Sequence, residues 1–156
     1  MAKYRLLSKE ELNELEKEFI EYLVLNGIDA DKWEALKKDK PAIANKTVEL
    51  FSDVVFEKIL RQAKFIKKVE PQNLIFIKCN EKNMNMIALN NIGDQTAFTK
   101  YQIFDFHKII EHAELVKGNK AYTQDRQQEL FMMLEKGFEI DDGENYNKLE
   151  LLLKEK

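Results

Sequence analysis

The fold is decided by residues 59–77, which read ILRQAKFIKKVEPQNLIFI. Up to Ala63 the apolar residues recur every three or four positions, a spacing typical of helices. From Phe65 onward they come in short blocks, which are typical of strands. This change of period near Lys64 predicts a helical N-terminal block that leads into a β-meander.

The first predicted helix has clear signals at both ends. Ser8 and Glu11 have the spacing of a capping box, in which each side chain accepts a hydrogen bond from the other residue's backbone. Asn26 and Gly27 both tolerate the left-handed conformation in which many helices end. We therefore expect one helix between Ser8 and Asn26.

Two further helices are expected before the strands. A short one follows Asp29 or Asp31, either of which can cap it, and carries Trp33. Pro41 suits the first position of a third helix, which reaches about Ala63. The apolar residues expected to face the interior from this third helix are Val48, Phe51, Val54, Val55, Ile59 and Leu60.

Three strands are predicted after Lys64, at Phe65–Val69, Leu74–Ile77 and Met84–Leu89. Because the connections between them are short, the pairing should be antiparallel. Glu114-Leu115-Val116, within the ambiguous stretch 113–121, is a candidate fourth strand.

The C-terminal part is expected to be mainly helical. The predicted helices cover Lys100 to about His112, with a capping box at Thr99 and Gln102, then residues 124–136 and 144–154, with a brief extended piece at 138–140 between the last two. Helices, then a three- to four-stranded antiparallel meander, then helices define an α+β protein. Five glycines and two prolines leave little room for linkers, so residues 1–156 are expected to form a single domain.

The composition narrows the class of function. The 156 residues include 25 Lys and Arg against 28 Asp and Glu, and this balance offers no basic excess for nucleic acid. No apolar run reaches the length of a signal peptide or of a membrane-spanning helix. We expect a cytoplasmic protein that binds no membrane, and the charge balance disfavours nucleic acid as its partner.

The residues that usually carry metal or nucleophilic chemistry do not form a known motif. His107 and His112 are five positions apart, which places them on different faces of a helix, so no metal site is expected. Around Asp141 and Gly143 the spacing does not match a calcium loop. Cys79 lies in an apolar run and is expected to be a buried structural thiol. No phosphate-binding loop is found, so no cofactor and no catalytic residue are assigned.

Four residues form a candidate interaction surface. Asp53 and Glu57 are four positions apart on the third helix, so both carboxylates project from one face. Two carboxylates this close can serve acid–base or metal chemistry. The alternative is a solvated helix face on which Glu57 pairs with Arg61. Trp33 and Tyr122 are hot spots if exposed and core residues if buried, and for Trp33 we favour core packing.

A combination of short motifs spans nearly the whole chain. These motifs are Tyr4-Arg5-Leu6-Leu7-Ser8-Lys9-Glu10-Glu11-Leu12, Glu18-Phe19-Ile20, Gly27-Ile28, Trp33-Glu34, Lys37-Lys38, Pro41, Phe51-Ser52-Asp53, Lys120-Ala121-Tyr122 and Glu135-Lys136-Gly137. Together they resemble a family of small uncharacterised proteins from Bacteroidetes-type bacteria. The resemblance implies a cytoplasmic bacterial domain of unknown function and supplies no catalytic residue.

Three functions stay open from the sequence. We favour a non-catalytic accessory or protein-interaction domain, whose partner is a protein. One alternative is a small enzyme that uses Asp53 and Glu57 in a cleft between the helices and the sheet. The other is an RNA- or ribosome-associated factor that binds through lysines such as Lys37, Lys38, Lys67 and Lys68.

Overall fold

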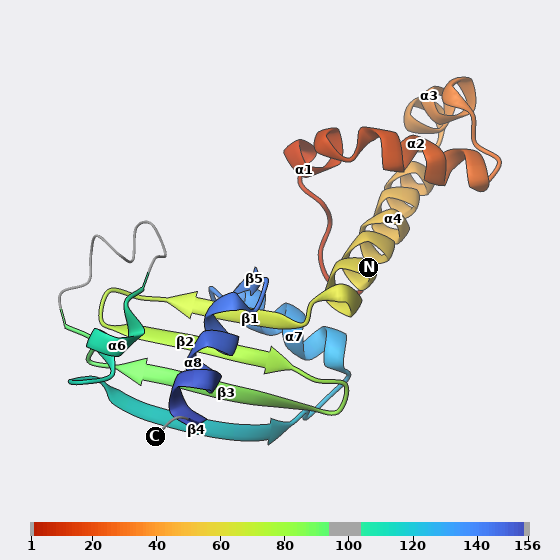
Figure 1. Ribbon diagram of the computed structural model, residues 1–156. Helices are drawn as coiled ribbons and strands as arrows, with labels where there is room; N and C mark the ends of the chain where they lie inside the picture. Colours follow the sequence, from red (N-terminus) through yellow and green to blue (C-terminus); the bar gives the residue numbers. More distant parts are fainter. Residues whose placement is uncertain (1, 94–103, 155–156) are drawn as a thin grey trace. The chain divides into compact units, whose positions relative to one another are not determined.

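The computed structural model describes residues 2–93 and 104–154. They fall into two compact units, Met1–Arg61 and Gln62–Lys156 (Figure 1). The first unit is helical and the second contains an antiparallel sheet with helices, so the predicted α+β class is confirmed. Within the described ranges, no helix combines the length and apolar character needed to cross a membrane.

The helices of the first unit are α1 (Lys9–Glu14), α2 (Glu16–Leu25), α3 (Ala30–Asp39) and α4 (Pro41–Gln62). The capping box is present, because the Ser8 hydroxyl accepts the Glu11 N–H and the Glu11 carboxylate accepts the Ser8 N–H. Phe19 of α2 packs on Phe51 of α4, with ring centroids 4.9 Å apart. This aromatic contact holds α2 against α4.

The predicted single helix from Ser8 to Asn26 is wrong, because the chain bends at Leu15. Its backbone has φ −102° and ψ 22°, and its N–H is shared between the carbonyls of Glu11 and Leu12 at 3.1 and 3.2 Å. No glycine or proline marks the bend. Contacts on either side of Leu15 orient α1 and α2 separately, since the segment before α1 and the Phe19 ring are each held against α4.

α4 buries only part of the face predicted. Phe51 and Leu60 are buried as expected, but Val54 is 53% exposed and Ile59 41% exposed. The buried face also includes Ser52 and Phe56. Val54 is two positions from each of these, about 200° around the helix, and therefore faces away from the core.

The second unit contains a five-stranded sheet with the order β4-β3-β2-β1-β5. Its strands are β1 (Phe65–Val69), β2 (Asn73–Cys79), β3 (Asn83–Asn90), β4 (Glu114–Ala121) and β5 (Glu139–Asp141). All neighbouring strands are antiparallel, and β1 to β4 form the predicted meander. β5 adds a strand beyond the three or four predicted, because Ile140 pairs with Ile66 at the other edge.

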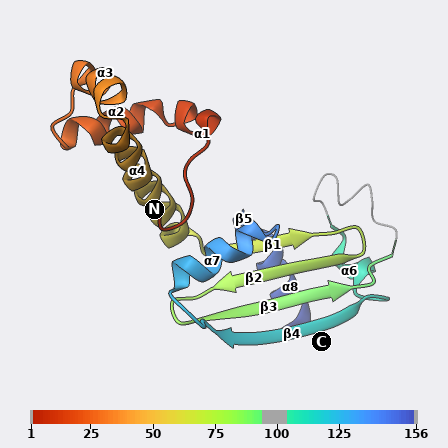
Figure 2. The ribbon, with the colours of Figure 1, turned by 180° about the vertical axis from the view of Figure 1, so that it is seen from behind.

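Helices lie on both faces of this sheet. Leu74 and Phe76 of β2 share one face with Ile87 and Leu89 of β3, and α8 (Glu144–Lys154) covers that face with Tyr146 and Leu149 (Figure 1). The opposite face bears buried Ile66, Ile77, Cys79 and Met84. α7 (Arg126–Glu135) lies on this second side, as Figure 2 shows from behind.

The helix predicted from Lys100 to His112 is wrong over its described part. Thr99 and residues 100–103 lie outside the described residues, and α6 covers only Phe106–Ile109. The Phe104 and Phe106 rings both contact Phe76, with centroids 6.2 and 5.9 Å away. The Asp105 side chain then accepts the Lys108 N–H, so the helix begins after Asp105.

Candidate functional site

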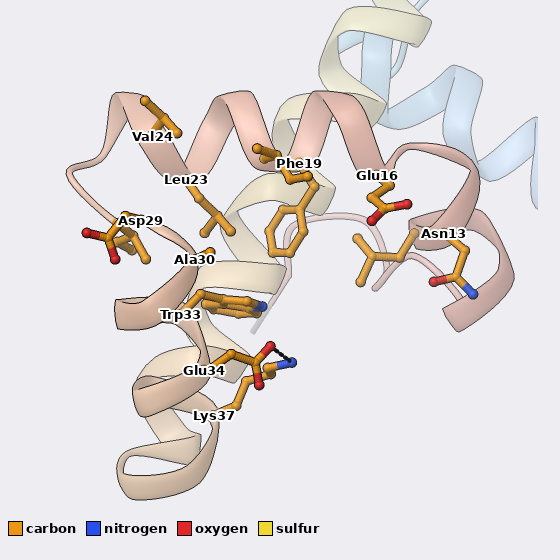
Figure 3. A pocket seen from close by; sticks show the side chains of 13 residues that line it. Asn13, Glu16, Phe19, Leu23, Val24, Asp29, Ala30, Trp33, Glu34 and Lys37 are labelled. Atoms are coloured by element: carbon orange, nitrogen blue, oxygen red, sulfur yellow. Dashed lines mark ion pairs between the residues drawn. The ribbon is translucent and has the colours of Figure 1, made fainter.

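The first unit carries an open apolar groove between α2 and α3, with a cavity volume of about 500 Å³ (Figure 3). We call it the α2–α3 groove. Its lining residues are Leu12, Asn13, Glu16, Phe19, Ile20, Leu23, Val24, Ile28, Asp29, Ala30, Trp33, Glu34 and Lys37. All of them belong to the helical unit, so the groove is a feature of that unit alone.

The short connection between α2 and α3 produces the groove. Gly27 has φ +74°, a left-handed conformation that glycine adopts without steric cost, and it reverses the chain after α2. The Ile28 N–H then returns to the Leu23 carbonyl at 2.8 Å. Asp29 caps α3 by accepting the Lys32 N–H at 2.8 Å. The two helices therefore diverge from a tight turn and leave space between them.

Aromatic rings form the inner wall of the groove. The Trp33 ring meets Phe19 edge-to-face, with centroids 5.2 Å apart and planes at 86°. Phe19 and Leu23 are buried, whereas Trp33 is half-buried. Trp33 thus packs on the core through its contact with Phe19 and lines the groove with its remaining surface. It combines the two roles considered from the sequence, those of a core residue and of an exposed aromatic residue.

Two aliphatic side chains of the groove face solvent. Ile20 is 51% exposed and Val24 is 62% exposed, and they are one helical turn apart on α2. Neither was among the predicted site residues. Their signal in the sequence is two apolar residues at a four-residue spacing beside the buried positions Phe19 and Leu23.

Charged groups lie around this apolar surface. Glu34 and Lys37 of α3 form an ion pair at 2.9 Å, and the Lys37 Nζ is 5.9 Å from the centre of the Trp33 ring (Figure 3). Glu16 projects from α2, and the Asp29 carboxylate is used in the cap of α3. The groove lining therefore carries three carboxylates and one ammonium group.

The predicted pair Asp53 and Glu57 lies elsewhere in the helical unit and binds the N-terminal segment. Asp53 accepts the backbone N–H groups of Lys3 and Tyr4 at 2.8 and 3.3 Å. Glu57 accepts the Tyr4 hydroxyl, and this hydrogen bond holds the pKa of Glu57 below its ordinary value. Glu57 also reaches Arg61 at 3.9 Å, as predicted for an i,i+4 pair.

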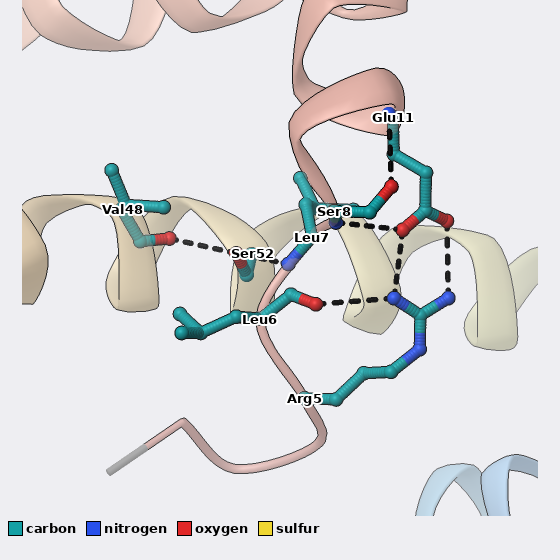
Figure 4. Close-up of polar contacts among 7 residues, drawn as sticks. All are labelled: Arg5, Leu6, Leu7, Ser8, Glu11, Val48 and Ser52. Atoms are coloured by element: carbon teal, nitrogen blue, oxygen red, sulfur yellow. Dashed lines mark hydrogen bonds and ion pairs between the residues drawn. The ribbon is translucent and has the colours of Figure 1, made fainter.

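The same segment is fixed further along, as Figure 4 shows. The Leu7 N–H donates to the buried Ser52 hydroxyl at 3.1 Å, and Ser52 donates to the Val48 carbonyl at 2.8 Å. Arg5 binds the Glu11 carboxylate with both terminal nitrogens, at 2.7 and 3.0 Å. We call residues 3–8 the N-terminal strap. Asp53 and Glu57 have a structural role, because they bind this strap to α4.

Tyr122 belongs to the second unit and takes part in a polar cluster around the end of β2. Its hydroxyl donates to the Asn80 carbonyl at 2.6 Å, and burial raises its pKa. Arg126 donates to the carbonyls of Asn80 and Cys79 at 3.1 and 3.2 Å. Thus Asp53 and Glu57 line one pocket together, Trp33 lines a different groove, and Tyr122 lies in the other unit.

Cys79 is buried and unpaired by a disulfide, as the sequence predicted. Burial raises the pKa of its thiol to about 11, which disfavours the reactive thiolate. Among the described residues, no three His, Cys, Asp or Glu side chains are grouped so that they could hold a metal ion.

These features describe a small α+β protein with a helical unit that bears an apolar groove and a second unit built on an antiparallel sheet. The chain belongs to a family of unknown function, DUF6495, whose model matches residues 1–154. The match confirms the resemblance to an uncharacterised family and extends over both units. Comparison with curated proteins and with solved structures found no match.

Proposed function

We propose that this chain is a non-catalytic protein-interaction domain that accepts an amphipathic helix of a partner protein in the α2–α3 groove. The observation that carries the proposal is the exposure of Ile20 and Val24 beside the half-buried Trp33 ring. Covering such apolar surface is favourable, at about 25 cal/mol per Å² removed from water. A helix that brings its own apolar stripe would cover all three side chains at once.

The dimensions of the groove favour a helical occupant. The α2 wall runs from Glu16 to Val24, which corresponds to a length of about 12 Å, or a little over two helical turns. Helices bind grooves through apolar side chains repeated every three or four positions. Two to three such side chains fit a wall of this length.

The enzyme and the RNA-associated factor are supported less well than the interaction domain. Most of the residues considered for them already have partners within the chain. Asp53 and Glu57 line a pocket together, but each carboxylate already accepts hydrogen bonds from the N-terminal strap. Of the lysines considered for RNA binding, Lys37, Lys67 and Lys68 are ion-paired with Glu34, Asp141 and Glu70, respectively. An enzymatic role and RNA association therefore stay alternative predictions.

Trp33 is the only tryptophan of the chain, so its fluorescence reports directly on the groove. The probe is a synthetic helical peptide of about 18 residues with leucines repeated every three or four positions and equal numbers of Lys and Glu elsewhere. We expect the peptide to change the Trp33 emission in a saturable manner. A peptide of the same composition with its leucines scrambled is the control and should not do so.

Two matched variants locate the binding site. Ile20→Asp should weaken peptide binding by about ten-fold or more, because it places a charge where an apolar contact forms. Ile43→Asp changes a residue of similar exposure, 48%, that lies on α4 outside the groove lining, and should leave binding unchanged. Equal losses in both variants, or no binding by the wild-type protein, would contradict the proposal.

A further inference from the structure

We infer that the helix accepted by the α2–α3 groove is basic, and that one of its lysine or arginine side chains takes the place that Lys37 now occupies beside Glu34 and Trp33. This inference rests on the proposed function, because it specifies the partner of the same groove. The evidence is the distribution of charge around the groove and the contacts of Lys37.

The walls of the groove are acidic. Its lining has Glu16, Asp29 and Glu34 against Lys37 alone. The sequences of α1 and α2 together contain six glutamates and two lysines, whereas α3 has three acidic and three basic residues. Since interfaces pair potentials of opposite sign, a positively charged helix matches this surface and a negatively charged one does not.

Lys37 shows how a cation fits at the mouth of the groove. Its ammonium group is 2.9 Å from a Glu34 carboxylate oxygen and 5.9 Å from the centre of the Trp33 ring. A cation near an aromatic face and a carboxylate gains both a cation–π and an ionic interaction. The mouth therefore already accommodates the chemical group that we assign to the partner.

The internal pair is weak enough to be exchanged. The side chains of Lys37 and Glu34 are 48% and 71% exposed, and exposed ion pairs of this kind contribute little to stability. A partner arginine would offer Glu34 two parallel hydrogen bonds, which the Lys37 ammonium cannot form. Among the described residues Glu16 forms no ion pair, so it is a second carboxylate available to a basic helix.

The experiment compares two helical peptides that share the same leucine positions and differ in charge. One carries lysine and the other glutamate at the remaining charged positions, and Trp33 fluorescence measures both affinities. At low salt we expect the lysine peptide to bind about ten-fold more tightly, with a difference that shrinks as salt screens the charges. Far-ultraviolet circular dichroism of each protein variant confirms that it is folded.

Three protein variants separate a local effect from the net charge of the protein. Glu16→Gln and Glu34→Gln should each weaken the lysine peptide by about three- to five-fold. Glu18→Gln removes an exposed glutamate of α2 that does not line the groove, and should change the affinity by less than about two-fold. Lys37→Met keeps an apolar stem but removes the competing cation, and should tighten binding of the lysine peptide by about two- to five-fold.

The outcomes distinguish this inference from the proposed function. The inference of a basic partner would be overturned if the glutamate and lysine peptides bound with equal affinity. It would also be overturned if Glu18→Gln lowered the affinity for the lysine peptide as much as Glu16→Gln. The groove function would still stand if the charge-balanced peptide bound and Ile20→Asp abolished that binding. Failure of all three peptides to change Trp33 emission would refute both.

Discussion

At the scale of the residue, Gly143 shows how one position links two elements. The chain enters α8 there with φ +87°, and a Cβ atom at this position would lie 2.4 Å from the Phe65 ring of β1. Phe65 in turn contacts Tyr146 of α8, with ring centroids 5.7 Å apart. Glycine is therefore required both by the backbone conformation and by the close approach of an aromatic ring.

We predict that Gly143→Ala lowers the free energy of unfolding by about 2–4 kcal/mol, from the left-handed backbone and from the displacement of the Phe65 ring. Gly27→Ala is the matched control, because Gly27 has φ +74° but a Cβ atom added there would meet no neighbouring atom within 4 Å. It should cost only the backbone term, about 1 kcal/mol. Urea unfolding measures the free energy of unfolding of both variants. Equal losses in the two variants would show that the Phe65 ring moves aside freely.

At the scale of the element, carboxylates join the N-terminal strap to the helices. The Arg5 guanidinium and then the Ser8 N–H lower the pKa of Glu11 from 4.5 to about 2. The Tyr4 hydroxyl lowers the pKa of Glu57 in the same direction. Each carboxylate binds protons less readily in the folded chain than in the unfolded one, so both stabilise the fold when they are ionised.

We predict that the stabilisation from Glu11 is present above pH 4.5 and is lost as the pH falls toward 2. Glu11→Gln should therefore destabilise the protein at pH 6 and have almost no effect near pH 2. Glu14→Gln changes another exposed glutamate of α1 and should not alter the pH dependence. Thermal unfolding at several pH values tests this, and parallel curves for wild type and Glu11→Gln would contradict it.

At the scale of the whole molecule, each unit contains its own reporter group. Trp33, the only tryptophan, lies in the helical unit, and Cys79, the only cysteine, is buried in the sheet of the second unit. Both units contain buried residues, and the family model spans both. If residues 1–156 form a single domain, as predicted, the two units should unfold together in one cooperative transition.

We predict that both reporters change at the same urea concentration. Trp33 fluorescence follows the helical unit, and labelling of the Cys79 thiol follows the second unit, because burial protects this thiol in the folded chain. A single cooperative domain gives coincident transitions. Labelling of Cys79 at a clearly different urea concentration would instead show that the units unfold as two domains.

The sequence by itself determined the features that depend on neighbouring residues. The capping box at Ser8 and the period change at Lys64 correctly predicted where α1 and β1 begin. The run Leu74–Ile77 correctly predicted a strand, now seen as the central strand β2, and residues 144–154 form the last helix as expected. Capping, turn chemistry and hydrophobic period act over a few positions, so one sequence contains them.

Only the tertiary structure decided the features that depend on contacts between distant residues. These are the bend at Leu15, the exposure of Val54, the pairing of β5 with β1 and the late start of α6. The groove also depends on such contacts. Only the packing of α2 against α3 leaves Ile20 at the surface and Trp33 half-buried. Hydrophobic period indicates which residues prefer burial, but the packing partners determine which of them are covered.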